Sequence, residues 1–226
     1  MKSLTFQATL SVFRKEVIAA SRFKGTWLTM LMFSFTTLSL SSLAFKGTAT
    51  DSATLSALYW IIIFFSAMTS VDRLFIEEEF SGTIRMLKAY GGAIPILFGK
   101  MLYGFLLLLA ISVIATFFFI VLFDGNIPQE SSVFFFVNLI LGVWGLSAAG
   151  TFLAALSASA NVKSGLFPVL MLPVMLPVLL PVTEATTEIF EGGAFDVSAV
   201  FPVFLYDLIL TVTSSLLFDY VWYEDL

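Results

Sequence analysis

Apolar residues gather in six long runs along the chain, and most of the charged residues fall between these runs. A helix needs about 20 residues, at about 1.5 Å of rise per residue, to cross about 30 Å of hydrocarbon. Each run is long enough, so the pattern predicts an all-α integral membrane protein with six transmembrane helices. The runs cover residues 26–45, 52–71, 101–123, 133–160, 164–183 and 197–221.

Residues 1–25 carry a different pattern. Apolar side chains recur there at spacings of three and four, whereas Arg14, Lys15 and Arg22 fall on other faces. This arrangement predicts an amphipathic helix that lies in the membrane interface, followed by a six-helix transmembrane domain over residues 26–226. A basic tail without regular structure is the alternative. The recurring apolar residues are Phe6, Leu10, Phe13, Val17 and Ala20.

Composition supports membrane insertion and removes several kinds of chemistry. Of the 226 residues, 59% are hydrophobic and 12% are charged, and the mean hydropathy is +0.99, which is far too apolar for a water-soluble globule. Without Cys or His, the chain has no thiol chemistry, no Cys/His metal site and no histidine to ligate haem iron. The net charge of -5 argues against nucleic acid as a partner.

The basic residues predict how the chain is oriented in the membrane. Of the 11 Lys and Arg residues, all but Lys46 fall on the side that holds the two termini. Because Lys and Arg favour cytoplasmic loops, both termini are predicted to be cytoplasmic.

The longest loop predicted on the basic side, residues 72–100, concentrates charge in a chain that otherwise avoids it. Leu74, Phe75 and Glu78 lie about one turn apart. The second transmembrane helix is therefore expected to extend into the cytoplasm until Gly82 stops it.

Three consecutive acids near the end of this extension are candidate contacts for another protein. Their carboxylates can pair with Arg or Lys on a partner surface, so that a movement of the partner is transmitted to a continuous helix. A solvated helix end is the alternative. A second, short amphipathic helix is expected over residues 84–90. The three acids are Glu77, Glu78 and Glu79.

Asp207 lies inside the sixth run, where a charged side chain costs about 2.5–3.5 kcal/mol on insertion scales. It is expected to face protein or a polar cavity, and Thr211, four residues later, can hydrogen-bond to it. Asp207 then lines a substrate path or a subunit contact, or makes a local packing bond.

Four prolines interrupt the fifth run at spacings of five, four and four residues. Each removes a backbone donor, and the carbonyl that this frees needs another partner inside the membrane. The proline face is therefore predicted to be buried in protein, in a helix that is bent or broken and that lines a substrate path or only provides shape. The prolines are Pro168, Pro173, Pro177 and Pro181.

Small residues repeat every four positions along the fourth run. Such a row allows close helix packing, either within the chain or in a dimer. The row consists of Ser147, Thr151, Ala155 and Ser159.

Several of these features resemble a known family. The Glu-x-x-Gly-Thr motif at residues 79–83, followed by an apolar helix and a return through Pro95 to Lys100, resembles the type-2 ABC permeases. More narrowly, the six-helix layout, the Asp-Arg-Leu-Phe sequence at residues 72–75 and the Pro-Val-Leu sequence at residues 177–179 are similar to the haem exporter protein B family (CcmB) of cytochrome c maturation.

Two features depart from the pattern of that family. Arg85 and Lys88 follow the Gly-Thr pair, where the family commonly has a leucine-rich run, in some members with acids. The glycine that often follows the Pro-Val-Leu sequence is absent.

The resemblance implies a non-catalytic permease subunit that works as a homodimer in the bacterial inner membrane, together with a separate CcmA-like ATPase. The chain has no G-x-x-x-x-G-K-[ST] motif, so ATP is expected on the partner. Haem is implied as the ligand handled, either delivered or released with a chaperone, and CcmC-like and CcmD-like membrane proteins are implied as further partners. The residues that the resemblance assigns to ATPase coupling are Asp72, Arg73, Glu77, Glu78, Glu79, Gly82 and Thr83.

An ion-gradient-driven secondary carrier for a small solute is the alternative function. Such carriers usually place several polar groups at mid-membrane and contain inverted repeats. Asp207 alone fits that description, and no repeat is evident.

Overall fold

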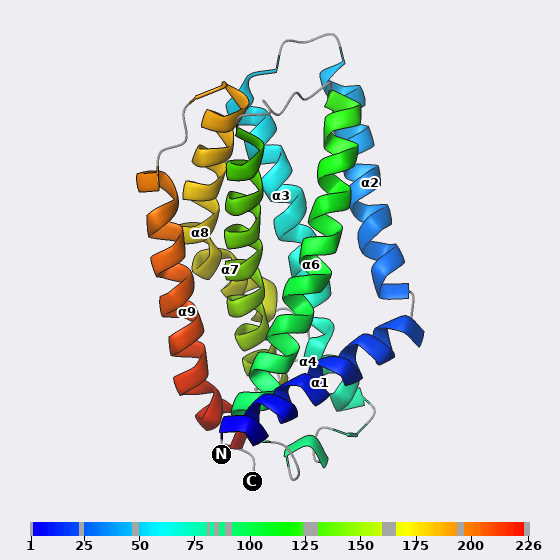
Figure 1. The fold of residues 1–226 in the computed structure, drawn as a ribbon. Helices are drawn as coiled ribbons and strands as arrows, with labels where there is room; N and C mark the ends of the chain where they lie inside the picture. Colours follow the sequence, from blue (N-terminus) through cyan, green and yellow to red (C-terminus); the bar gives the residue numbers. More distant parts are fainter. Residues whose placement is uncertain are drawn as a thin grey trace.

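The computed structural model describes residues 2–22, 25–46, 50–80, 82–83, 86–88, 92–123, 131–159, 166–193 and 197–223. This part of the chain forms a bundle of long helices and contains no strand (Figure 1). The helices are α1 (Lys2–Arg22), α2 (Gly25–Phe45), α3 (Ser52–Val71), α4 (Arg73–Phe80), α6 (Ala93–Phe123), α7 (Ser132–Ser159), α8 (Leu166–Phe190) and α9 (Val197–Tyr223).

Six helices of the described chain are long and apolar enough to cross a membrane, which confirms the predicted fold class. Each of them coincides with one of the six apolar runs. The spanning segments are Leu28–Phe45, Ser52–Phe75, Ala93–Phe123, Ser132–Ala158, Phe167–Phe190 and Val200–Tyr223.

The third transmembrane helix begins earlier than the pattern predicts. α6 has 31 residues and is therefore about 46 Å long, which exceeds about 30 Å of hydrocarbon. The assignment of residues 93–100 to a loop is wrong, because the Ile96 amide already donates to the Gly92 carbonyl at 3.3 Å. Pro95 stands in the first turn, where its missing amide costs no helical bond.

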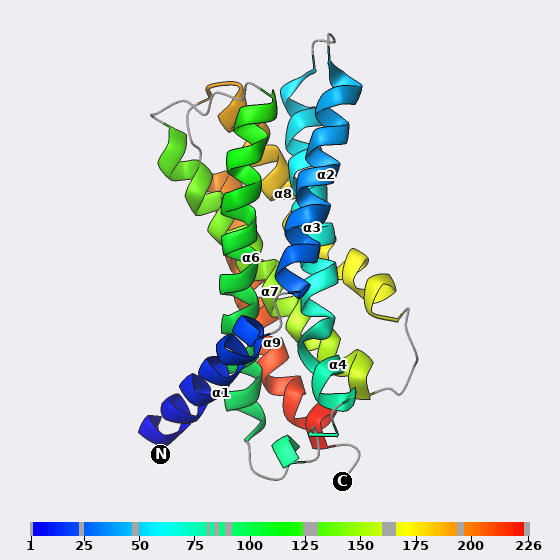
Figure 2. The ribbon, with the colours of Figure 1, turned by 90° about the vertical axis from the view of Figure 1, so that its right-hand side faces the viewer.

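α1 crosses one end of the bundle at a steep angle to the other helices (Figure 1, Figure 2). It packs on α6, where an ideal Cβ added to Gly99 would lie only 2.7 Å from the Cβ of Val12. Phe6 and Leu10 point away from the protein, with 70% and 51% of their surface exposed. A helix is present where the pattern predicts one, and its location in the membrane interface stays a prediction.

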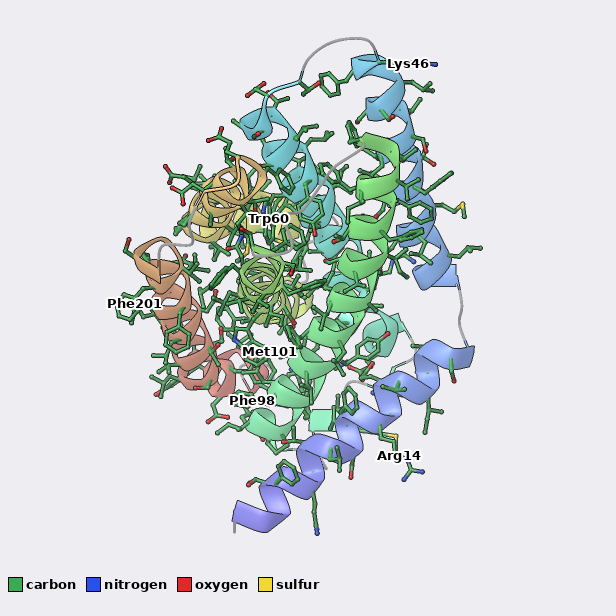
Figure 3. The ribbon with its side chains drawn as sticks, turned by 45° about the horizontal axis from the view of Figure 1, so that its top comes forward. Arg14, Lys46, Trp60, Phe98, Met101 and Phe201 are labelled. Carbon is green, nitrogen blue, oxygen red and sulfur yellow. The ribbon has the colours of Figure 1, made fainter. Side chains whose placement is uncertain are left out.

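α1 begins and α9 ends at the same end of the bundle (Figure 1). Arg14 lies at that end, and Lys46 lies at the opposite one (Figure 3). The two ends of the bundle therefore differ in basic residues as the pattern predicts, while the cytoplasmic location of the termini stays a prediction.

α7 lies at the centre of the bundle and packs against α3, α6, α8 and α9. Its glycines let neighbours approach closely, since an ideal Cβ on Gly142 would lie 2.3 Å from the ring of Trp60 and one on Gly150 would lie 2.9 Å from Val71. Trp60 accordingly lies inside the bundle (Figure 3). Of the two roles open to the small-residue row, packing within the chain is the one observed. Its buried members are Ser147, Thr151 and Ala155.

α8 is a single unbroken helix from Leu166 to Phe190, so of the two forms predicted, bent or broken, the broken one is excluded and the bend stays a prediction. A broken helix would expose more unpaired backbone amides and carbonyls to hydrocarbon than the prolines alone do. This cost keeps the remaining helical hydrogen bonds in place. The first turns of α8, in yellow, lean out of the bundle (Figure 2).

The proline face of α8 is not buried in the described chain either. The opposite face packs inward through Met171, Met175 and Val178, all of which are fully buried. The spacing predicts that the prolines share a face, but the apolar residues between them are equally suited to the core and occupy it. Pro173 and Pro177 are exposed, and Pro168 and Pro181 are half-buried.

Candidate functional site

α4 extends α3 beyond the apolar run. The one residue between them, Asp72, has helical backbone angles (φ −52°, ψ −37°). α4 ends where Gly82 adopts φ +68° and the Thr83 amide donates to the Glu78 carbonyl at 3.0 Å, as in a Schellman cap. The predicted extension of the second transmembrane helix and its stop at Gly82 are both confirmed.

Aromatic side chains join α4 to the end of α9. Phe75 is fully buried, and its ring centre lies 6.2 Å from that of Phe218 and 6.0 Å from that of Trp222. The Phe218 and Trp222 rings stack on each other at 5.4 Å. Lys88 places its ammonium 5.6 Å from the centre of the Trp222 ring. Lys88 belongs to the helical residues 86–88, and the rest of the helix predicted over residues 84–90 lies outside the described residues.

Four charged side chains from three helices meet beside α4. The Lys100 Nζ lies 2.9 Å from Oε2 of Glu78 and 2.8 Å from Oε1 of Glu16. The Lys15 Nζ lies 3.1 Å from Oε1 of Glu16 and pairs with Oε1 of Glu78. We call Lys15 and Glu16 of α1, Glu78 of α4 and Lys100 of α6 the charge cluster. Its positive and negative groups alternate around a closed ring, so their formal charges cancel.

Lys100 is the most deeply buried member of the charge cluster, with no exposed surface. Besides its two carboxylate partners, its ammonium donates to the Leu74 carbonyl and lies 4.8 Å from the centre of the Phe75 ring. A buried cation without partners is costly, so these contacts explain how Lys100 fits inside the most apolar helix of the described chain. They also fasten α6 to the first turn of α4.

Lys15 lies at the more exposed edge of the charge cluster. Burial alone would lower the pKa of its ammonium, but the hydrogen bond to Glu78 and the negative charges of Glu16 and Glu78 outweigh burial. The pKa of Lys15 is therefore raised above its ordinary 10.5, and the cluster holds this lysine in its charged form.

The residues predicted for ATPase coupling fall into different settings. Glu78 is only 7% exposed and is turned inward to two lysines of the chain, whereas its contact with a partner protein stays a prediction. The physical reason for the inward turn is Lys100, whose buried charge requires a carboxylate within reach. The side chains of Glu77 and Glu79 lie outside the described residues. Arg73, Gly82 and Thr83 are exposed, and Asp72 is half-buried.

The sequence pattern does not identify the other three members of the charge cluster as site residues. Lys100 offers one signal, because a lysine inside a long apolar helix needs a buried partner. Lys15 and Glu16 offer none, since neighbouring opposite charges are ordinary on the surface of a helix. Nothing in one sequence pairs Lys100 with Glu16, which is 84 positions away.

Asp207 is 2% exposed and lies where α7, α8 and α9 meet. Its Oδ1 lies 2.3 Å from the position of an ideal Cβ on Gly145, and a methyl group of Val178 lies 3.1 Å from that position. Neither carboxyl oxygen has a hydrogen-bond partner among the described residues. Thr211 instead donates to the backbone carbonyl of Asp207 at 2.7 Å and accepts from Trp144 at 3.2 Å. The bond expected between the Asp207 and Thr211 side chains is therefore not formed.

A second buried polar group lies toward the opposite end of the bundle and has no counterpart in the sequence predictions. The Thr186 hydroxyl accepts from the Trp60 indole at 2.8 Å and from the Asn138 amide at 3.0 Å. Asn138 also donates to the Val182 carbonyl at 2.9 Å. These bonds tie α3, α7 and α8 together inside the membrane.

The charge cluster and the aromatic contacts of Phe75 connect α4 mechanically to the neighbouring helices. Within the described ranges, no group of three or more acidic residues is placed to hold a metal ion. What the arrangement does offer is a short helix, α4, that is joined by side chains to α1, α6 and α9.

A family model described as "CcmB protein" matches residues 7–218. The matched region contains all four members of the charge cluster, α4 and Asp207. A search of the curated proteins found no match.

Proposed function

Because this chain belongs to the CcmB family of haem-exporter ABC permease components, we propose that it couples ATP hydrolysis on a separate ATPase subunit to haem handling during cytochrome c maturation. The observation that carries this proposal is the position of α4. This helix extends α3 beyond the apolar run and is joined to three further helices by the charge cluster and by Phe75.

The contacts of α4 support a route for mechanical coupling. A push on the exposed end of α4, near Gly82 and Thr83, meets a capped helix that resists bending. Lys100 and Leu74 carry the displacement to α6, and the stacked rings of Phe218 and Trp222 carry it to α9. Both helices pack on the central α7, so a movement at one end is felt in the body of the permease.

The proposed complex contains two copies of this chain and a CcmA-like ATPase that binds ATP, together with CcmC-like and CcmD-like membrane proteins. It lies in a bacterial inner membrane, with both termini in the cytoplasm. Haem is the ligand handled, and the ATPase drives either its delivery or the release of a haem-loaded chaperone. The chain contains no His or Cys, so neither residue type ligates the haem iron in this protein. Its proposed part in either process is a mechanical movement that the ATPase drives.

Charge reversal at the end of α4 tests the coupling. Glu79→Lys should abolish co-purification of the ATPase subunit in mild detergent. Glu184→Lys makes the same change at an exposed position on the opposite end of the bundle and should leave co-purification intact. Equal ATPase recovery with both variants would contradict the proposed contact. Uptake that an uncoupler abolishes, without any associated ATPase, would favour an ion-gradient-driven carrier instead.

The absence of cysteine makes the orientation testable with single introduced thiols. Met86 is 63% exposed at the α4 end, and Glu188 is exposed at the opposite end. A membrane-impermeant maleimide should label Met86→Cys only from the cytoplasm and Glu188→Cys only from the other side. The reverse labelling would invert the proposed topology.

A further inference from the structure

The charge cluster links α1 to α4 both directly and through Lys100 of α6. Glu78 uses its two oxygens separately, since Oε1 pairs with Lys15 of α1 and Oε2 lies 2.9 Å from Lys100 of α6. Glu16 of α1 closes the ring with its Oε1, 2.8 Å from Lys100. α4 therefore cannot shift relative to α1 without separating opposite charges, of which Glu16, Glu78 and Lys100 are largely removed from water.

We propose that Glu78 and Lys100 are positioning residues that make α1 move together with α4. This inference rests on the proposed function, in which an ATPase displaces α4. It adds that the displacement reaches the N-terminal helix, so that α1 is a driven part of the permease as well as a membrane anchor.

The packing of α1 on α6 gives this movement a pivot. At Gly99 the missing side chain lets α1 approach so closely that an ideal Cβ there would lie 2.7 Å from Val12 and 2.9 Å from the carbonyl of Thr9. Lys15 and Glu16 lie one turn beyond Val12 along α1. A pull exerted by Glu78 on Lys15 therefore acts beside a fixed contact and tilts α1 about it.

The outward face of α1 is suited to transmit such a tilt. Phe6, Leu10 and Val17 are 70%, 51% and 43% exposed, and they share one stripe of the helix. The side of α1 that faces the protein carries Val12 and Glu16 instead. A tilt driven from the protein side therefore moves the exposed apolar stripe against the surrounding lipid or a neighbouring subunit.

The deep burial of Lys100 distinguishes a positioning role from an ordinary surface ion pair. Exposed pairs contribute little because water and salt screen them, whereas Lys100 has no exposed surface. Its ammonium also binds the Leu74 carbonyl, which belongs to the first turn of α4. Lys100 thus holds both the first turn of α4, through Leu74, and α1, through Glu16.

The test uses the complete complex of this chain with its ATPase, reconstituted in membranes. One cysteine is introduced for a spin label in the cysteine-free chain, either at Met86 beside α4 or at Ser11 on the exposed side of α1. Each labelled complex is then measured with and without a non-hydrolysable ATP analogue. In the wild-type background, nucleotide should change the label mobility at both positions.

The variant Glu78→Gln/Lys100→Met removes one negative and one positive charge together. With it, the label at position 86 should still respond to nucleotide, while the response at position 11 should fall at least about fivefold. Lys100→Arg keeps the charge and should retain the response at position 11. The matched control Arg14→Met/Glu184→Gln removes the same charges at exposed positions and should leave both responses unchanged.

The possible outcomes separate this inference from the proposed function. An undiminished response at position 11 in the Glu78→Gln/Lys100→Met variant overturns the inference and leaves ATPase coupling standing. No response at either position, with no ATPase in the wild-type complex, overturns both. If the double variant does not accumulate, Lys15→Met/Glu16→Gln replaces it, because it removes both contacts of α1 with Glu78 and Lys100 and leaves those two buried charges paired with each other. A full response at position 11 in Lys15→Met/Glu16→Gln likewise overturns the inference.

Discussion

The ammonium of Lys100 lies 2.8 Å from the carboxylate of Glu16, which is 84 positions earlier in the chain and on a different helix. Lys100 is fully buried, and the Glu16 side chain is only 11% exposed. The helices α1 and α6 are thus held together by a charge pair that has been taken out of water. Such a pair is sensitive to the loss of either partner, because the remaining charge stays buried.

Replacement of Lys100 by Met should destabilise the protein strongly. The Met side chain keeps an apolar stem of similar length, but Glu16 and Glu78 then face each other without the cation that separates them. Removing one partner of a buried pair typically costs about 3–5 kcal/mol. Unfolding curves in mild detergent measure the change, and Lys46→Met, an exposed lysine at the opposite end, should stay within about 0.5 kcal/mol of wild type.

The double variant Lys100→Met/Glu78→Gln completes this comparison. It removes a positive and a negative charge together, so it should be more stable than Lys100→Met alone. A single Lys100→Met variant that unfolds like wild type would show that the charge cluster contributes nothing to stability.

Gly145→Ala should destabilise the contact between α7 and α9. The new Cβ would lie 2.3 Å from Oδ1 of Asp207, so one of the two helices must shift, and overpacking of this kind typically costs about 1–3 kcal/mol. In the Asp207→Ala background that clash is removed, and the cost of Gly145→Ala should shrink. It should not vanish, because Val178 lies 3.1 Å from the same Cβ position.

A parallel substitution controls for general effects on α7. Gly142→Ala places its Cβ 2.3 Å from the Trp60 ring and does not involve Asp207. Its cost should be the same with Asp207 or Ala at position 207. If both glycine variants respond equally to Asp207→Ala, the specific contact between Gly145 and Asp207 is not the cause.

The six transmembrane helices could be predicted from the sequence because hydrocarbon leaves the backbone no other partner for its polar groups. An apolar run of sufficient length is therefore nearly a sufficient signal. The boundaries were less predictable, as α6 illustrates. Its first residues, 93–100, include Pro95 and Lys100, which read as loop residues, yet the proline fits a first turn and the lysine finds buried partners.

The orientation of faces and the charge cluster could not be predicted in the same way. Spacing places Pro173 and Pro177 on one face of α8, but only the positions of the other helices decide that this face is exposed. Likewise, Glu78 carries the same local signal as its acidic neighbours. It turns inward because Lys100, 22 residues later on another helix, needs a negative partner, and that is a tertiary contact.

Gly82→Ala should weaken the cap at the end of α4. Gly82 has φ +68°, where a residue with a Cβ is strained by about 1–2 kcal/mol, although nothing lies within 4 Å of the Cβ that would be added. Hydrogen exchange of the Thr83 amide, which donates to the Glu78 carbonyl, should therefore become faster by about tenfold. Gly25→Ala is the matched control, because its Cβ also meets nothing within 4 Å and its backbone angle is ordinary. Its effect on the Thr83 amide should be negligible, and equal exchange in both variants would rule out backbone strain at Gly82.

Lys15 gives the charge cluster a pH dependence of defined sign. Burial alone would lower its pKa, but Glu78 and Glu16 outweigh burial and raise the pKa of Lys15 above the ordinary 10.5 in the folded chain. The stabilisation by the charged lysine is then fully present below about pH 10.5 and is lost as the pH rises through the raised pKa. Wild type should exceed Lys15→Met in melting temperature by a constant margin from about pH 7 to about pH 9, and the margin should narrow only at higher pH. Parallel melting curves of the two proteins in detergent measure it. A margin that already narrows below about pH 9 would mean that Lys15 is not held charged by its two carboxylate neighbours.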